Sequence, residues 1–422
     1  MWYRKFMFAL LLAATLIMGC EEQYKAEVYQ GRVHNIHETN LTSSFELSSE
    51  QQIETAAVTE PDGSLTLRRA LALTLMNNPE LRVFSLETRA AQARELQAGL
   101  WPNPELEVEV EEVGGTGDRR GFDAAETTVQ LSQLIELGDK SQKRKKVASF
   151  EKELADIDYH NKKLEVFSEA AKIFIAVLQA QEKLQLSGEL LKLSEESFNV
   201  VEQRVNAGKD SPLEKTRAFV GLSNIKIKHR ETQRNLEFVR KELSSFWGQD
   251  KPLFEQAAGN LNDIQELSSL DELVLRLKLN PQYTRWETEI KKSRAVLDLE
   301  KSKAIGDLTI GGGLQRFNET DDNAFIFGVS IPLPVANRNQ GAKQEAAYNL
   351  AKAREEQKAA WLKLQNEFNR TYQELTNSYS QATSLRNEVL PGALEVFNAA
   401  TTAYREGKVD YLNVLDAQRT LF

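Results

Sequence analysis

The chain has 422 residues, of which 41% are hydrophobic and 27% are charged, and it contains one cysteine. Its formal net charge of −9 offers no basic surface to nucleic acid, so we expect no nucleic-acid partner. The sequence contains no Ser-His-Asp spacing, phosphate-binding loop or metal triad, which makes an enzyme the least favoured class and indicates no cofactor.

The N-terminus predicts an exported lipoprotein. Two basic residues precede the apolar run FMFALLLAATLIM, so residues 1–19 are expected to be a signal peptide. The run ends in the motif IMGC, which resembles a bacterial lipobox and makes Cys20 the predicted lipidation site. Glu21 follows, and this resemblance favours the outer membrane. The alternative role of a lone cysteine is a buried small residue or a free thiol.

Residues 20–62 are polar and are expected to be a lipidated tether. His34 and His37 lie in it beside Glu38, but these are too few ligands for a closed metal site. No stretch of about 18 apolar residues follows the signal, so no helical membrane span is predicted.

A duplication organises the rest of the chain. Asn78-Pro79 recurs as Asn280-Pro281, 202 residues later, and Gly208 recurs as Gly407, 199 residues later. A period this long indicates a duplicated module rather than a solenoid. Each module is predicted to hold a long helix, a strand pair, a very long helix, a glycine turn and a returning helix. The expected repeats are residues 63–260 and 261–422.

Four segments are predicted to be amphipathic strands. In PELEVEVEEV, which begins at Pro104, three aliphatic residues alternate with four glutamates. Strands of about ten residues with one apolar and one polar face suit a transmembrane barrel, and a soluble hairpin is the alternative. Four strands cannot close a barrel, so several copies must share one. The predicted strands are about residues 104–113, 125–134, 307–317 and 324–333.

The predicted helices are long. Residues 138–207 contain no proline and would extend over about 105 Å as one helix. Two helices of 36 residues, 65–100 and 212–247, would together match that length. The fold class is therefore mainly α, with a small β part and a tube of helical hairpins. A coiled-coil seam is predicted along the longest helix at Leu164, Phe167, Ala171, Phe174 and Leu178.

The two helices with the Asn-Pro motif and four further segments carry a family resemblance; the segments are QLIELGDKSQKR, RVNAGKDSPLEK, IPLPVANRNQGAKQEA and YREGKVDYLNVLDAQRTL. With them the chain resembles the TolC-type outer-membrane efflux family, and within it the cobalt–zinc–cadmium (CzcC-like) branch, over about residues 62–422. The resemblance implies a homotrimer with a shared 12-stranded outer-membrane β-barrel and a periplasmic α-barrel. It also implies a periplasmic adaptor protein and an inner-membrane resistance–nodulation–division pump as partners.

The function implied is a passive exit duct for heavy-metal cations. A duct for drugs, dyes or secreted proteins on the same fold is the first alternative. A structural coiled-coil lipoprotein that braces the envelope is the second, although it gives the amphipathic strands no role.

The glycine turns are expected at the end far from the strands. Gly208 and Gly407 would first be helix C-caps, because glycine adopts the left-handed conformation readily. The resemblance adds a role in docking the adaptor, which is consistent with basic neighbours, although charged tips are also ordinary solvated surface. The docking candidates are Arg204, Gly208, Lys209, Arg405, Gly407 and Lys408.

Three charged residues are candidates for a periplasmic gate. Asp410 and Asp416 would face the axis of three copies, and Asp416 aligns with Arg217 of the first repeat. An ion pair between Arg217 and Asp416 would hold the gate closed. The alternative is a surface pair of less than about 1 kcal/mol.

The glutamates of the first strand would line the lumen of a three-copy barrel as acidic rings that favour cations, or as a plain polar lining. They are Glu105, Glu107, Glu109 and Glu111. The basic run at residues 143–146 would contact anionic headgroups or form a solvated helix face. Because the returning helix of the first repeat extends to Trp247, its equivalent would end near residue 446, and the second repeat is expected to be C-terminally truncated.

Overall fold

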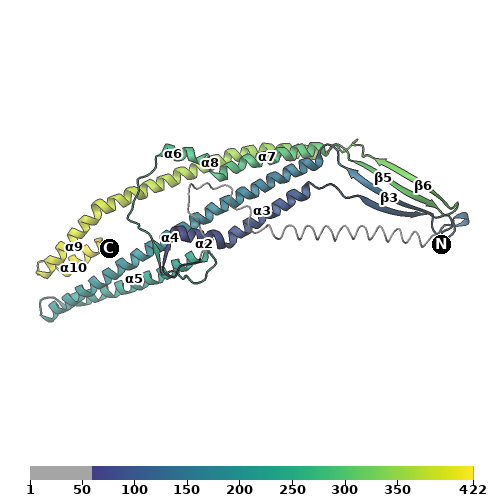
Figure 1. Ribbon diagram of the computed structural model, residues 1–422. Coiled ribbons are helices and arrows are strands. Elements are labelled where there is room, and N and C mark those ends of the chain that lie inside the picture. Colours follow the sequence, from purple (N-terminus) through teal and green to yellow (C-terminus); the bar gives the residue numbers. More distant parts are fainter. Residues whose placement is uncertain (1–58, 422) are drawn as a thin grey trace, which may run out of the picture. The chain divides into compact units, whose positions relative to one another are not determined.

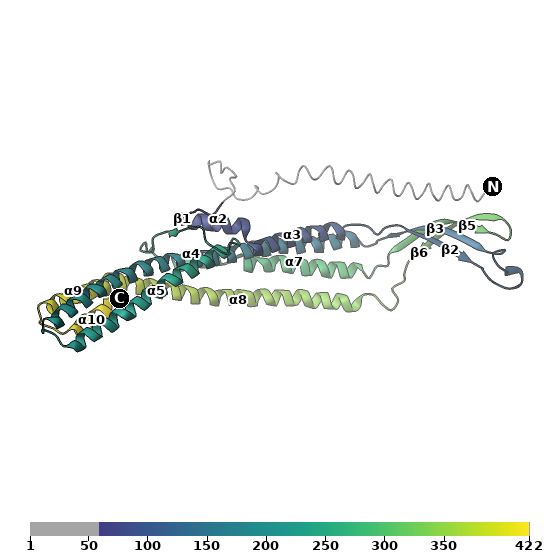
Figure 2. The same cartoon turned by 90° about the horizontal axis from the view of Figure 1, so that it is seen from below.

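The computed structural model describes residues 59–421, so the predicted signal peptide, Cys20 and the tether up to Val58 lie outside the described residues. The described part is mainly α-helical, with a two-stranded and a four-stranded sheet. Figures 1 and 2 show the four-stranded sheet at one end of the helices and the helical turns at the other. None of the described helices is long and apolar enough to cross a membrane.

The first repeat contains one very long helix, α4. Its elements are β1 (Ser64–Thr66), α2 (Leu67–Asn77), α3 (Pro79–Ala98), β2 (Glu105–Glu111), the 3₁₀ turn η1 (Gly117–Arg119), β3 (Glu126–Ile135), α4 (Lys140–Asn206), α5 (Pro212–Ser245) and β4 (Gln256–Ala258). The 67 residues of α4 form one uninterrupted helix, as the absence of proline predicts.

The second repeat has the same order but an interrupted long helix. Its elements are α6 (Leu270–Leu277), α7 (Pro281–Ser302), β5 (Leu308–Phe317), β6 (Asp322–Ser330), α8 (Gln340–Ser384), the π-helical turn η2 (Leu385–Val389), α9 (Leu390–Arg405) and α10 (Tyr411–Leu421). The π-helical turn precedes Pro391, which has no N–H for a regular helical hydrogen bond.

The single helix predicted over residues 65–100 is wrong. It is divided at Asn78, whose backbone is extended with φ −65° and ψ 123°. The ring of Pro79 disfavours a helical conformation of the residue before it. The Asn78 side chain then accepts a hydrogen bond from the Leu81 N–H at 3.1 Å and starts α3 as its N-cap. The repeated Asn280-Pro281 divides α6 from α7 in the same way.

The long helix α4 packs against α2, α3, α5 and α7. Its main core lies where Phe174, Val177 and Leu178 meet Leu243 of α5. Each fully buried side chain of this size contributes roughly 1.5–3 kcal/mol. The predicted seam is only partly correct, because Leu164 is exposed within the chain, and the buried positions between Leu164 and Phe174 are Val166 and Ala170.

The segment before β1 is attached to the connection after α5. The Glu60 carboxylate is buried and accepts hydrogen bonds from Trp247 Nε1 at 2.8 Å, the Leu253 N–H at 2.6 Å and the Phe254 N–H at 3.1 Å. Beside it, β1 pairs in parallel with β4. Because a buried carboxylate needs such donors, these contacts fix where the N-terminal segment joins the helices.

Candidate functional site: a two-faced sheet and the helical tips

The four-stranded sheet has the order β2-β3-β5-β6, and all its neighbouring strands are antiparallel. The register places Val108 beside Val129, Val129 beside Leu314, and Leu314 beside Phe325. One apolar row therefore crosses all four strands on one face. Phe327, on the same face of β6, is 87% exposed. An apolar surface of this extent marks a contact with lipid or protein.

The opposite face is polar. A row across the strands runs from Glu107 through Gln130 and Gly313 to Ile326. The predicted lumen glutamates Glu105, Glu107, Glu109 and Glu111 share this face on the edge strand β2, and all four are exposed. Among residues 59–421, no group of three or more His, Cys, Asp or Glu side chains is placed to hold a metal ion.

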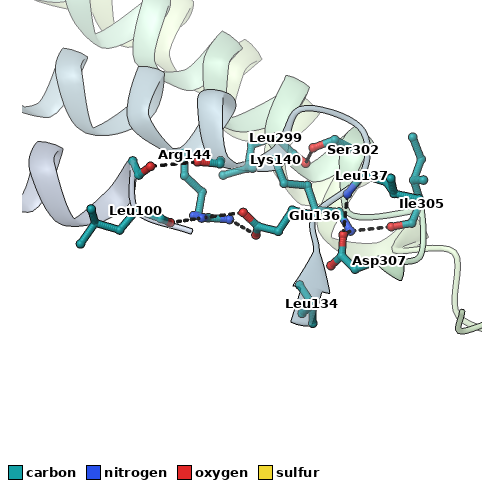
Figure 3. Close-up of polar contacts among 12 residues, drawn as sticks. Leu100, Leu134, Glu136, Leu137, Lys140, Arg144, Leu299, Ser302, Ile305 and Asp307 are labelled. Carbon is teal, nitrogen blue, oxygen red and sulfur yellow. Dashed lines mark hydrogen bonds and ion pairs between the residues drawn. The ribbon is translucent and has the colours of Figure 1, made fainter. Parts of the chain in front are cut away.

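Strands and helices are joined by a polar contact between the two repeats (Figure 3). Lys140 Nζ at the start of α4 donates to Asp307 Oδ1 at 2.7 Å and to the Ile305 carbonyl at 2.5 Å. Asp307 Oδ1 also accepts from the Leu137 N–H at 2.9 Å. The turn before Lys140 is left-handed at Asp139, with φ 58°. One carboxylate thus fixes both the end of β3 and the first turn of α4.

A second contact at this junction involves the basic run. Arg144 forms two hydrogen bonds with the Glu136 carboxylate and one with the Leu100 carbonyl at 3.3 Å (Figure 3). The hydrogen bonds that Arg144 donates to Glu136 raise the pKa of the Arg144 guanidinium. Lys143 Nζ donates to the Gly138 carbonyl at 2.9 Å. The basic run at residues 143–146 was predicted to contact headgroups or solvent. Two of its side chains instead form hydrogen bonds with carbonyl and carboxylate groups of the same chain.

The glycine turns are C-caps, as predicted. Gly208 and Gly407 have φ of 72° and 77°, and both follow the last turn of a helix. Their N–H groups donate to the Val205 and Tyr404 carbonyls, each at 2.9 Å. A side chain at either position would be strained in this left-handed conformation.

The tips of the two hairpins are connected through Asp210, a residue that sequence reasoning missed. Its carboxylate accepts two hydrogen bonds from Arg204, at 2.7 and 3.0 Å, and one from the Tyr404 hydroxyl at 2.8 Å. The Arg204 guanidinium also lies over the Tyr404 ring, 4.9 Å from its centroid. Arg204 is therefore engaged within the chain, whereas the other basic docking candidates, Lys209, Arg405 and Lys408, are exposed.

These contacts change the acidity of the groups involved. The hydrogen bonds from Arg204, followed by that from Tyr404, lower the pKa of the Asp210 carboxyl against the opposing effect of burial. Burial and the neighbouring Asp210 charge raise the pKa of the Tyr404 hydroxyl. At neutral pH the arrangement is a carboxylate held by a guanidinium and a neutral phenol.

The expected ion pair between Arg217 and Asp416 is not formed within the described chain. Arg217 instead pairs with Glu214 on its own helix, at 2.7 Å, and Asp416 is exposed. Equivalent positions in two repeats lie at the same height of the bundle but need not face each other. The hairpins meet instead through a buried hydrogen bond from Gln418 Nε2 to Ser194 Oγ at 3.0 Å. Asp410 is exposed at the start of α10.

The comparisons with known proteins agree on one family. The family described as outer membrane efflux protein matches residues 70–249 and 275–422. The chain is 33% identical to the cobalt-zinc-cadmium resistance protein CzcC of Cupriavidus metallidurans over 363 residues, 86% of this chain and 85% of that protein.

Solved structures have the same fold. A membrane protein from Pseudomonas aeruginosa superposes with a TM-score of 0.70 at 18% identity, over 84% of each chain. A crystal structure of CusC, a protein described as forming a transmembrane channel, superposes with a TM-score of 0.65 at 18% identity, over 84% of this chain and 86% of that one.

Proposed function

The chain belongs to the outer membrane efflux protein family and is an efflux channel rather than an enzyme, and we propose that its cargo is heavy-metal cations. The similarity to a cobalt-zinc-cadmium resistance protein over most of both chains carries this assignment. The acidic edge of the sheet supports it, because glutamates that line a pore favour cations. The channel is passive and leaves metal selection to its partners.

We infer that the apolar face of the sheet contacts the lipid of the outer membrane. At about 3.4 Å per residue, the 10 residues of β5 extend over about 34 Å. A strand tilt of about 40° reduces this to a height of about 26 Å, close to the apolar band of outer-membrane barrels. The aromatic and aliphatic side chains of β6 then replace exposure to water by contact with lipid.

The sheet has two open edges, β2 and β6, and lipid does not tolerate unpaired edges. The open edges therefore require further copies, and the number three comes from the resemblance to the efflux family: we propose a homotrimer in which three sheets close one barrel. The polar face with Glu105, Glu107, Glu109 and Glu111 would line its lumen. The helices would continue the duct into the periplasm as an α-barrel, with a lipid on Cys20 as a second attachment to the outer membrane.

The proposed partners are a periplasmic adaptor and an inner-membrane resistance–nodulation–division pump. The exposed Lys209, Arg405 and Lys408 beside the two glycine turns would contact the adaptor. Asp410 and Asp416, exposed at α10, would line the periplasmic mouth.

Growth of a strain without this gene tests the cargo. The panel is zinc, cobalt, cadmium, nickel, copper and silver, beside dyes and antibiotics. Sensitivity confined to metals, reversed by the intact gene, is the expected result. Sensitivity to dyes or antibiotics alone would retain the duct and overturn the metal assignment. No sensitivity at all would indicate either that another duct replaces this one or that the chain acts as the structural lipoprotein.

A further inference from the structure

The two strand pairs of the sheet have the same register. Glu107 opposes Gln130 in the first pair, and Thr309 opposes Ser330 in the second. Equivalent residues are thus 202 apart on the first strands and 200 apart on the second strands. The same 200 residues separate Asp139 and Asn339, the left-handed residues before α4 and α8. The internal symmetry therefore assigns every strand residue an equivalent.

The pairing of β3 with β5 joins the second strand of one repeat to the first strand of the other. In it Gln130 opposes Gly313, whose equivalents are Ser330 and Glu111. We propose that β6 of one copy pairs with β2 of the next in this register, with Ser330 opposite Glu111, and that Glu105 completes the strand–helix junction of its neighbour. The inference rests on the proposed ring of copies and specifies its contact.

Hydrogen-bond directions agree with this edge pairing. One step beyond the β3–β5 ladder, the Asn318 N–H donates to the Ala125 carbonyl at 3.0 Å. The direction of the backbone hydrogen-bonding groups alternates along an antiparallel strand. The N–H and C=O groups of odd-numbered residues of β3 therefore point toward β5, and those of even-numbered residues point toward β2. The equivalent odd residues directly after β6, which ends at Ser330, would then direct their backbone N–H and C=O groups toward the next copy once this segment extends the strand. They are Ile331, Leu333 and Val335.

The prolines of this segment lie where no donor is needed. Pro332 and Pro334 are the even-numbered residues, so their backbone nitrogens, which carry no hydrogen, point toward the β5 side. There the ladder register ends, because Leu308, the first residue of β5, would oppose residue 331. A proline is tolerated on the side of a strand that makes no ladder hydrogen bond. The prolines thus leave in place the N–H groups of Ile331 and Leu333, which would face the neighbouring copy, whereas the Val335 N–H donates to the Leu333 carbonyl in the single chain.

The same register continues the apolar face across the joint. It sets Ile331 opposite Val110. Leu333 and Val335, which one chain links by a hydrogen bond from the Val335 N–H to the Leu333 carbonyl at 2.8 Å, would come opposite Val108 and Leu106 when this turn extends on pairing. In one chain Leu333 is 76% exposed and Val335 is 74% exposed. Pairing would give these side chains a row of apolar neighbours, as Val129 has beside Leu314 within the chain.

Glu105 is the equivalent of Asp307, which holds the junction between β3 and α4. Asp307 accepts from the Leu137 N–H and from Lys140 Nζ, whose equivalents are Asn337 and Gln340. In the proposed register Glu105 of one copy reaches this position at the β6–α8 junction of the next. Within one chain, Gln340 accepts a hydrogen bond from the Arg338 N–H at 2.8 Å and donates to the Ala336 carbonyl at 3.3 Å, so this junction lacks the carboxylate that Asp307 supplies to the first, and Glu105 of the neighbouring copy would supply it. Glu105 then serves the joint, and the three other glutamates line the lumen.

Cysteine pairs test the register. Glu111→Cys with Ser330→Cys would form covalent dimers and trimers on oxidation, because directly opposed residues meet the geometry of a disulfide. Glu111→Cys with Gly328→Cys and Val113→Cys with Ser330→Cys report a slip of two residues in either direction. Thr128→Cys with Gln315→Cys is the matched pair within one chain. The parent, whose one cysteine is Cys20, gives the background.

Crosslinking between chains by the first pair alone is the expected result. Crosslinking by either slipped pair instead would overturn the register and leave the ring standing. If no pair links two chains while the Thr128/Gln315 pair oxidises internally, the ring itself is contradicted, and with it that part of the proposed function.

A charge introduced at Gln340 tests the junction. Gln340→Lys recreates between copies the contact that Lys140 makes with Asp307 within the chain. We expect this variant to raise the temperature at which the trimer dissociates in detergent. The gain should vanish in a Glu105→Gln background and persist in a Glu107→Gln background. No gain, or a gain independent of Glu105, would overturn the assigned role of Glu105.

Discussion

Asp210 connects the two helical hairpins at their tips, because it binds Arg204 of its own hairpin and Tyr404 of the other. Asp210→Asn removes the negative charge that both donors need. A hydrogen bond to a charged group contributes about 1.5–3 kcal/mol, so we expect the tip contact to weaken by about 2 kcal/mol. Amide hydrogen exchange over residues 201–210 and 401–410 would measure it. Asp416→Asn, at an exposed aspartate, is the control and should leave exchange unchanged.

The pH dependence of this contact follows from the lowered pKa of the Asp210 carboxyl. A group whose pKa is lower in the folded state stabilises that state above its unfolded pKa, and the contribution is lost as the pH falls through the folded value. Protection of the tips should therefore be constant from neutral pH down to the ordinary aspartate range near 3.8, and decline below it. The Asp210→Asn protein should lack this decline; an unchanged decline would assign it to another group.

Lys140 has a comparable role at the other end of α4. Its side chain is 9% exposed, and that of its partner Asp307 is 25% exposed. Lys140→Met keeps much of the apolar stem but leaves the Asp307 carboxylate without its cation, so the loss should be about 1.5–3 kcal/mol. Thermal unfolding followed by circular dichroism would detect it. Lys146 is an exposed lysine further along α4, so Lys146→Met is the control and should unfold at the same temperature as the wild type.

At the scale of elements, the side chains of β6 alternate between the two faces of the sheet. Phe327→Arg would place a charge on the proposed lipid face, where a midplane arginine costs about 2–4 kcal/mol. We expect less assembled protein in the outer-membrane fraction. Ile326→Arg, one residue earlier on the polar face, should assemble normally. Equal assembly of both variants would contradict the assignment of the faces.

Local patterns predicted the elements well. The alternation in ELEVEVE and the absence of proline along α4 are properties of adjacent residues. The strand β2 and the helix α4 cover the segments that show these patterns. The same local rules would also have divided the first helix at Asn78-Pro79, had the restriction before proline been applied. Before Pro391 the outcome differs, because Leu390 keeps a helical backbone (φ −62°, ψ −46°) and a π-helical turn accommodates the proline within the long helix.

Contacts between distant segments were not predictable in the same way. Tyr404 and Asp210 are 194 residues apart, and no spacing rule brings them together. The internal alignment paired Arg217 with Asp416, but alignment identifies equivalent positions, not neighbours. Used for equivalence, the alignment is reliable, since both strand pairs share one register.

At the scale of the whole molecule, one chain of the proposed trimer provides a third of the strands, of the helices and of the tips, and its sheet is not closed by itself. The apolar face and the open edges of the sheet need lipid and further copies, whereas the cores of α4 and α5 are complete within the chain. A lipid on Cys20 would hold each copy at the membrane before the barrel closes.

The loss of metal from preloaded cells tests the central claim most directly. Cells without the gene, and the same cells with the gene restored, are loaded with zinc, cobalt or cadmium, washed, and assayed for cell-associated metal over time. Faster loss of at least one of these metals from the complemented cells is the predicted result. Equal loss of every metal, together with a difference in the exit of a dye, would contradict the account of a metal exit duct.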